Sequence, residues 1–279
     1  MHSDVSDIGQ SLLDRWPASH LSVAIVDPTG IIASTGELDR VYRLASVTKP
    51  LVATAVLLAV EEGSLSLDQP AGPDGATLRH LLAHASGVSP DDPTTTLAAP
   101  GTRRIYSNAG FELAAGALVD ATGLSMRDYL AEGVCEPLSM TRTELSGPAG
   151  FGAFSSARDL AAWLRAWLVP GFLLDDSTIA EATSVQFPDL DGVLPGYGPQ
   201  RPNPWGLGVE IRGTKSPHWT GSQNSPQTYG HFGQSGTFVW VDPAVGLGVV
   251  ALGDTDFGPW AVDLWCGLND AIVGHFARR

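Results

Sequence analysis

Strand-like segments at the two ends of the chain enclose a long helical stretch, and this order most constrains the fold. Near the N-terminus, residues 21–36 form two apolar runs around a turn at 27–30, which predicts a hairpin. Near the C-terminus, the predicted strands are residues 206–211, 236–242 and 246–254. The short turn between the last two strands makes them antiparallel. We therefore expect one sheet built from both ends of the chain.

The middle of the chain has helical periodicity. Apolar residues recur there at helical spacing, in segments that end at glycine or begin at capping residues. Together with one helix at each end, the predicted helices are residues 8–16, 51–62, 77–84, 111–121, 126–132, 157–168 and 259–276. No strand is predicted between residues 47 and 168. Residues 169–203 are rich in proline and glycine, which predicts a long irregular connection.

These elements predict an α+β fold, with an antiparallel sheet of about five strands flanked by helices and an inserted all-helical subdomain. Residues 1–45 and 169–279 are expected to form a discontinuous sheet subdomain. Residues 46–168 are expected to form a mostly helical subdomain. The two would make one structural unit with the active site between them.

Composition and charge exclude several kinds of partner. The chain has 16 Lys+Arg and 30 Asp+Glu, a formal net charge of −14, so no nucleic-acid partner is expected. The longest apolar run, residues 51–60, is too short to cross a bilayer, so no membrane partner is expected either. Residues 1–15 hold several acids and no apolar run, which is unlike a secretory signal and predicts a cytoplasmic protein. The oligomeric state is not predicted.

Ser46 and Lys49 are the first candidates for chemistry. Lysine occurs only at Lys49 and Lys215, and Lys49 lies three residues after Ser46 where a helix is predicted to begin. That spacing puts both side chains on one face, one turn apart. An amine in a partly desolvated site can be neutral enough to take the proton of a serine hydroxyl. The alternative is a capping serine followed by a lysine whose chain lies along the surface.

Two further segments supply candidate partners for Ser46. Tyr106 and Asn108 lie in a polar turn before the helix predicted from residue 111, and a phenol beside an ammonium can shuttle a proton. His231 precedes the strand predicted at 236–242, where an imidazole could face the helix that carries Ser46. The alternatives are a buried tyrosine with a turn asparagine, and a structural histidine.

We expect no cofactor and no metal. His80 and His84 have the spacing of a metal pair, but Leu81 stands where a zinc protease motif has glutamate. Cys135 and Cys266 have no CxxC spacing, so neither a metal knuckle nor a disulfide framework is predicted. The glycine-rich segment at 246–251 enters a strand instead of a helix, unlike a dinucleotide site.

Five segments in this order resemble the penicillin-recognising serine hydrolases: class C β-lactamases, serine D-alanyl-D-alanine carboxypeptidases and family VIII carboxylesterases. The resemblance covers nearly the whole chain and implies the β-lactamase/transpeptidase fold. The segments are LASVTKPLVATAVLLAVEEGSLSLDQP, LRHLLAHASGV, PGTRRIYSNAGFELAAGALVDATG, VCEPLSMTRTEL and GHFGQSGTFVWVDPAVGLGVVALGD.

The resemblance also implies roles for individual residues in an acyl-enzyme mechanism. Ser46 would be the nucleophile, and Lys49 and Tyr106 the coupled bases that later protonate the leaving group. Asn108 would bind Lys49 or the substrate amide. His231, in the motif that continues through Phe232 and Gly233, would stand where β-lactamases have lysine. The N–H groups of Ser46 and Gln234 would form the oxyanion hole.

Departures from the family pattern bear on the substrate. Phe232 stands where the family usually has a threonine that helps bind a substrate carboxylate, and the motif also lacks the lysine. We therefore expect weaker binding of an anionic β-lactam or peptide terminus. Uncharged esters or amides are favoured. Four aromatic residues are candidates for an apolar acyl pocket, with plain core as the alternative: Trp205, Trp219, Phe232 and Trp240.

The leading hypothesis is a serine hydrolase acting through an acyl-enzyme on Ser46, as a carboxylesterase or amidase with a small-molecule ester, amide or peptide substrate. The first alternative is a D-amino-acid peptidase or weak β-lactamase, and the second is an acyltransferase. A catalytically silent binding protein with the same fold is the alternative from a different class. Retention of Ser46, Lys49 and Tyr106 favours an enzyme.

Overall fold

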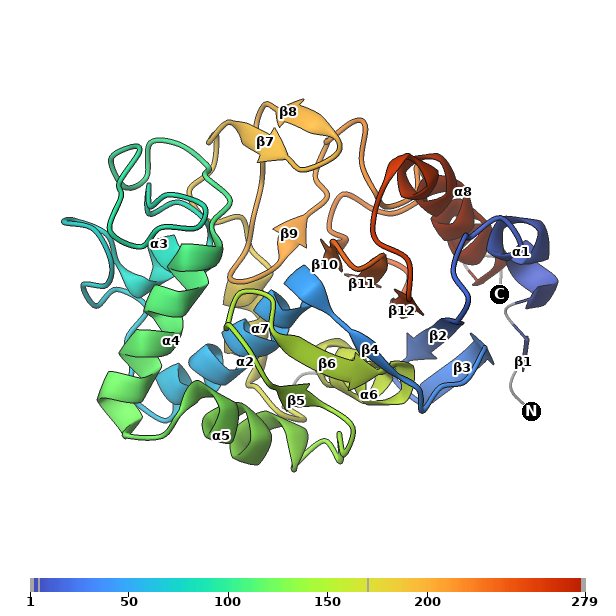
Figure 1. The fold of residues 1–279 in the computed structure, drawn as a ribbon, viewed down its shortest axis with the longest axis horizontal. Coiled ribbons are helices and arrows are strands. Elements are labelled where there is room, and N and C mark those ends of the chain that lie inside the picture. Colours follow the sequence, from blue (N-terminus) through green and yellow to red (C-terminus); the bar gives the residue numbers. More distant parts are fainter. Residues whose placement is uncertain (1–2, 5, 170, 277–279) are drawn as a thin grey trace.

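Strands from both ends of the chain form one sheet, as the sequence predicts (Figure 1). The structure is a computed structural model that describes residues 3–4, 6–169 and 171–276. Across the sheet the strands are β1 (Ser3–Asp4), β3 (Gly30–Thr35), β2 (Leu21–Asp27), β12 (Leu247–Gly253), β11 (Thr237–Asp242), β10 (Tyr229–Gly233) and β9 (Glu210–Ile211). Every neighbouring pair is antiparallel except β1 with β3. The expected five strands become seven because β1, at one edge, and β10, between β9 and β11, were not predicted.

Two segments of the sheet differ from the prediction. The segment at 206–211 is a strand only at Glu210–Ile211, because Leu207 N–H donates to Ala182 O and Gly208 N–H to Leu82 O, which ties these residues to the helical part. The segment around His231 was expected just before a strand and instead forms β10, paired with β11. Two glycines in this five-residue strand weaken its sequence signal.

The sheet is buried on both faces, and alternate residues point to two different cores. Val23, Ile25 and Trp240 pack with helices α1 (Ser6–Leu13) and α8 (Pro259–Phe276) on one face. Ala24, Val26 and Val239 belong to the larger core on the other face, with helix α6 (Ala157–Leu168). Figure 1 shows α1 and α8 together at one end of the molecule.

Four further helices gather beside the sheet, and two of them carry the predicted site residues Lys49 and Asn108. They are α2 (Thr48–Glu61), α3 (Leu78–Leu82), α4 (Asn108–Thr122) and α5 (Met126–Leu130), which continues in a π turn (Ala131–Cys135). Ser156 caps α6, accepting a hydrogen bond from Asp159 N at 3.2 Å. The division into a sheet subdomain and a helical subdomain stays a prediction. Helix α6, from the segment expected in the helical subdomain, packs against β12 and β2.

The expectation that residues 47–168 contain no strand is wrong. Strands β5 (Glu144–Leu145) and β6 (Ala153–Ser156) form a three-stranded sheet with β4 (Val41–Arg43). Each strand is so short that its side-chain alternation cannot be told from a loop in the sequence. The small sheet matters for the site because the loop between β5 and β6 carries Gly150 to Lys49.

The connection at 169–203 is also more ordered than predicted. Among its described residues it holds helix α7 (Asp176–Ala182) and the hairpin of β7 (Gly192–Leu194) and β8 (Gly198–Gln200). The buried guanidinium of Arg104 donates to three carbonyls of this connection, those of Gln186, Phe187 and Asn203. This segment therefore packs against the turn that precedes Tyr106.

Candidate functional site

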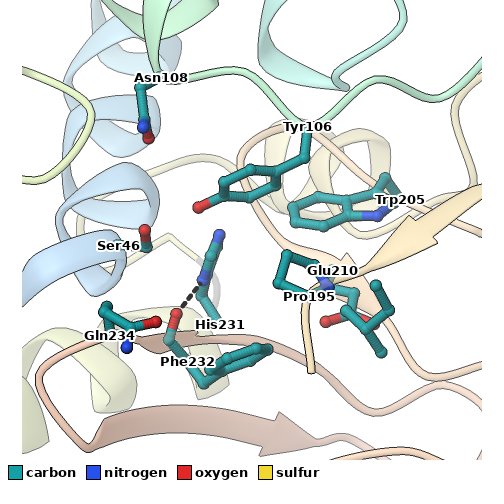
Figure 2. Close-up of a pocket in the computed structure, with 10 residues that line it drawn as sticks. Ser46, Tyr106, Asn108, Pro195, Trp205, Glu210, His231, Phe232 and Gln234 are labelled. Carbon is teal, nitrogen blue, oxygen red and sulfur yellow. Dashed lines mark hydrogen bonds between the residues drawn. The ribbon is translucent and has the colours of Figure 1, made fainter. Parts of the chain in front are cut away.

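A cavity of about 210 Å³ lies between the helical part and β10 of the sheet (Figure 2). Most of the residues predicted for the site line it. The lining residues are Ser46, Tyr106, Asn108, Leu194, Pro195, Trp205, Glu210, His231, Phe232 and Gln234. Residues far apart in the sequence therefore come together at one cavity.

Ser46 lies in a tight 3₁₀ turn (Ala45–Val47) directly before α2. Ala45 has φ +47°, a left-handed conformation that costs energy for any residue with a Cβ and is often found at functional sites. Lys49 follows in the first turn of α2, with Pro50 next to it. A proline is tolerated there because the first N–H groups of a helix have no partner within the helix.

Lys49 is completely buried, and its Nζ has three hydrogen-bond partners. It lies 2.7 Å from Asn108 Oδ1, 2.8 Å from Gly150 O and 3.3 Å from Ser46 Oγ. The two nearer atoms only accept hydrogen bonds, so a neutral amine would use both of its N–H groups on them. Its lone pair is then left for the Ser46 hydroxyl.

The pKa of Lys49 supports a neutral amine. Burial lowers the pKa to about 7, while the carboxylates of Glu112 and Asp91 oppose the lowering. Neither carboxylate touches Nζ directly. Asp91 accepts from Asn108 Nδ2 at 2.8 Å, and Glu112 accepts from Gly150 N at 3.0 Å. Each acid thus orients one of the two groups that accept hydrogen bonds from Lys49.

Tyr106 is held over Lys49, with the centre of its ring 4.5 Å from Nζ. Burial and the carboxylates of Glu210 and Asp91 raise the pKa of Tyr106, against a hydrogen bond with Ser46. The turn behind it is fixed by Ser107, whose hydroxyl accepts from Gly110 N at 2.9 Å and donates to Ser89 O at 2.7 Å. Tyr106 therefore keeps its proton at neutral pH, which leaves Lys49 as the better base.

His231 projects from β10 toward Tyr106 (Figure 2). Its Nδ1 lies 2.7 Å from the carbonyl oxygen of Phe232, which can only accept, so Nδ1 carries the proton. Burial, and the positive charge of Lys49 when that residue is protonated, lower the pKa of His231 to about 3. His231 is neutral at pH 7, with Nε2 as an acceptor that has no partner among the described residues. His231 therefore supplies no cation to the cavity at pH 7.

The other predicted site residues take different places. Gln234 and Phe232 line the cavity. Gly233 packs so closely on the Leu44 carbonyl that a Cβ would collide with it, which brings β10 against the turn of Ser46. Trp219 lies behind Phe232, with ring centres 5.9 Å apart, and is not a lining residue.

Of the four aromatic residues proposed for an acyl pocket, Trp205 and Phe232 line the cavity. Trp240 and Trp219 instead belong to the hydrophobic core on one face of the sheet, which was the alternative to an acyl pocket. The predicted oxyanion hole of Ser46 and Gln234 N–H groups stays a prediction, with both residues at the cavity.

Two residues of the site were not predicted from the sequence: Glu210, which lines the cavity, and Gly150, whose carbonyl binds Lys49. Glu210 had a signal, because a carboxylate between Val209 and Ile211 is unusual in an apolar strand. Gly150 had none, since its role is a backbone contact made by a loop.

The histidine pair considered for a metal has other contacts. His80 Nδ1 accepts from Thr77 N at 3.2 Å at the start of α3, and His84 Nδ1 accepts from Ser107 N at 3.1 Å. Among residues 3–4, 6–169 and 171–276, no helix is both long and apolar enough to cross a bilayer. The cytoplasmic location stays a prediction.

Comparison with known proteins assigns the family. The β-lactamase family profile matches residues 21–264. A solved structure described as a β-lactamase from Mycobacterium bovis is 52% identical, with 96% of this chain and 99% of that chain covered and a TM-score of 0.93.

Two curated relatives match shorter stretches. The D-alanyl-D-alanine-carboxypeptidase/endopeptidase AmpH of Escherichia coli is 29% identical over 143 residues, 38% of this chain and 37% of AmpH. Esterase EstB of Burkholderia gladioli is 45% identical over 64 residues, 18% of this chain and 16% of EstB. These alignments span well under half of either relative, whereas the family profile spans most of this chain. The chain belongs to the β-lactamase family.

Proposed function

We propose that this protein is a serine hydrolase that forms an acyl-enzyme on Ser46 and acts as a carboxylesterase or amidase on small uncharged substrates. The observation that carries the proposal is the hydrogen bonding of Lys49. Its two N–H groups have short acceptors in Asn108 and Gly150, and its remaining position faces Ser46 Oγ at 3.3 Å. A buried amine with a pKa of about 7 in this geometry is a general base for the serine.

The protons balance over the acylation step. Lys49 Nζ takes the proton of Ser46 Oγ as Oγ bonds to the substrate carbonyl carbon. The oxyanion is stabilised by the N–H groups of Ser46 and Gln234. Tyr106, which keeps its proton, gives it to the leaving oxygen or nitrogen as that bond breaks. Tyr106 then recovers a proton from the Lys49 ammonium. Water attacks the acyl-enzyme with the same groups in reverse order.

The charges around the cavity favour an uncharged substrate. A neutral His231 and the ring of Phe232 offer no cation or hydroxyl for a carboxylate. The walls include Leu194, Pro195 and Trp205, which suit an apolar group. EstB, a relative with esterase in its name, is consistent with this substrate class.

The test compares Ser46→Ala with Ser64→Ala, which changes an exposed serine beyond α2. We expect Ser46→Ala to lose hydrolysis of short p-nitrophenyl esters and labelling by a fluorophosphonate probe, as read by intact mass. Ser64→Ala should keep both. Full hydrolysis by Ser46→Ala, or probe label on another residue, would refute the proposal.

The alternatives give other outcomes in the same assays. Turnover of a chromogenic cephalosporin comparable with ester turnover would favour a weak β-lactamase, and release of D-alanine from a peptide would favour the peptidase activity that the name AmpH describes. Product formed from an added alcohol at the expense of hydrolysis would indicate an acyltransferase. Failure of every ester and probe with folded protein would indicate a silent binding protein.

A further inference from the structure

A buried carboxylate lies at the end of the cavity away from the nucleophile. Glu210 is 2% exposed, comes from β9 and lines the cavity. Figure 2 shows it on the opposite side of His231 from Ser46, beside Pro195 and below Trp205. The acyl-enzyme mechanism proposed above gives Glu210 no task.

Three donors hold the Glu210 carboxylate in place. Oε1 accepts from Lys215 Nζ at 2.6 Å and from His218 Nε2 at 2.9 Å. His218 is a neutral donor here, because its Nδ1 accepts from Thr220 N at 3.1 Å and so carries no proton. Oε2 accepts from Trp219 Nε1 at 2.7 Å.

One acceptor position of this carboxylate remains open. An ionised carboxylate has about four acceptor positions, two on each oxygen. The two on Oε1 are taken, while Oε2 has only the Trp219 donor among the residues that the structure describes. The Nε2 of His231, on the same cavity, is a second acceptor for which the described part of the chain offers no donor. Both atoms could therefore accept a hydrogen bond from a ligand in the cavity.

The charge of Glu210 restricts which ligand groups can bind beside it. Burial alone would raise the pKa of Glu210, but the Lys215 ammonium and the hydrogen bonds with His218 and Lys215 hold it below its ordinary value. Glu210 is therefore ionised, and Lys215 balances its charge. A second carboxylate brought by the ligand would be repelled, whereas a hydroxyl or amide N–H would be accepted.

We propose that the Glu210 end of the cavity is a subsite for a hydrogen-bond donor at the far end of the substrate's acyl chain. The favoured acyl group has an apolar body between Trp205 and Phe232 and a hydroxyl or amide N–H that donates to Glu210 Oε2. The acyl chain is the part that stays bonded to Ser46 Oγ, at the other end of the same cavity. This inference rests on the proposed acyl-enzyme function.

The first test uses the wild-type protein and matched p-nitrophenyl esters. In each pair, a terminal hydroxyl replaces a terminal methyl in acyl chains of equal length, and a third ester ends in a carboxylate. At the length that reaches Glu210, we expect kcat/KM for the hydroxyl ester to exceed that of the methyl ester about tenfold, since a hydrogen bond to a charged acceptor forms. The carboxylate ester should be the slowest. A methyl ester that is equal or faster at every length would overturn the subsite.

The second test assigns the preference to Glu210. We expect Glu210→Gln to bring the hydroxyl-to-methyl ratio close to one, because the charged acceptor is lost. The matched control is Glu144→Gln, an exposed glutamate paired with Arg127, which should keep the wild-type ratio. A preference that survives in folded Glu210→Gln would also overturn the subsite. If Glu210→Gln does not fold, the wild-type series still decides. Esters hydrolysed equally by Ser46→Ala would instead refute the proposed function.

Discussion

The two lysines of this chain occupy two buried regions that differ in one respect. Among the described residues, the hydrogen-bond partners of Lys49 at the start of α2 are all neutral: Ser46, Asn108 and the Gly150 carbonyl. Lys215 lies against the Glu210 carboxylate, with Nζ to Oε1 at 2.6 Å. Burial lowers the pKa of both lysines, but a contacting carboxylate opposes the lowering only at Lys215.

This difference separates a base from a structural cation. A lysine whose acceptors are uncharged gains little from its proton, so burial can make it a neutral amine near pH 7. A lysine that contacts a buried carboxylate keeps its proton, because losing it would leave the carboxylate uncompensated. Lys49 can therefore take part in proton transfer, while Lys215 holds Glu210 in place.

The largest effect is expected on activity, when Lys49 is replaced. Replacement Lys49→Met removes the proposed base while keeping an unbranched apolar chain, and we expect kcat/KM for a short p-nitrophenyl ester to fall by about 10²–10⁴-fold. The variant should still fold, as judged by circular dichroism and thermal unfolding, because cavity water can reach Asn108. Wild-type activity in folded Lys49→Met would remove the central argument for its role.

The next largest effect is expected on stability, when Lys215 is replaced. Replacement Lys215→Met leaves Glu210 buried without its cation, and we expect a loss of about 3–5 kcal/mol in the free energy of unfolding, measured with urea. The double variant Lys215→Met with Glu210→Gln should lose less than the two single changes added together. Additive losses would mean that the ion pair does not couple the two residues.

Much of the fold was predictable because its signals are long or repeated. The hairpin of β2 and β3 and the helices α6 and α8 have strong periodicity and clear turns or caps. The strands β5 and β6 were missed because two to four residues show no periodicity. Their pairing with β4 depends on distant contacts that local sequence does not record.

In the candidate site too, residues in short motifs were predictable, whereas features that depend on distant contacts were not. Ser46, Lys49 and Tyr106 were predicted because they lie in short motifs in a recognisable order. Ser46 and Tyr106 line one cavity, and the buried Lys49 contacts both of them. The neutral state of His231 was not predicted, since it depends on burial and on the Phe232 carbonyl. The Gly150 carbonyl was missed because any residue type has one.

A smaller effect is expected in the pH dependence. Since Lys49 must lose its proton to act as a base, kcat/KM should rise with pH through a pKa of about 7. The carboxylate of Glu112 raises that pKa, so Glu112→Gln should move the rise to lower pH while its amide oxygen still accepts from Gly150 N. Because Glu112 is exposed, the displacement should shrink at high salt.

The control for this profile is Glu144→Gln, which removes an exposed carboxylate that is not among the causes of the Lys49 shift. Its pH profile should overlay that of the wild type. A Glu112→Gln profile that moves to higher pH would contradict the sign of the electrostatic argument, and an unchanged profile at low salt would mean that Lys49 is not the group that titrates.

The smallest effect tests the geometry around Lys49. A Cβ added to Gly150 would lie 3.2 Å from Asn108 Cα and 3.3 Å from its Cβ, so Gly150→Ala must push apart the two acceptors of Lys49 by a few tenths of an ångström. We expect kcat to fall by roughly fivefold, since small misplacements of catalytic groups are costly. Gly116→Ala is the matched control within α4. Apart from the helix's own backbone and the neighbouring residues, no heavy atom of the described residues lies within 4 Å of its added Cβ, and alanine favours the helix by up to about 1 kcal/mol. That variant should be as active as the wild type and slightly more stable. If Gly150→Ala and the wild type have equal kcat, Lys49 can act without close positioning of the Gly150 carbonyl and Asn108. The neutral acceptors that distinguish Lys49 from Lys215 would then matter less for catalysis.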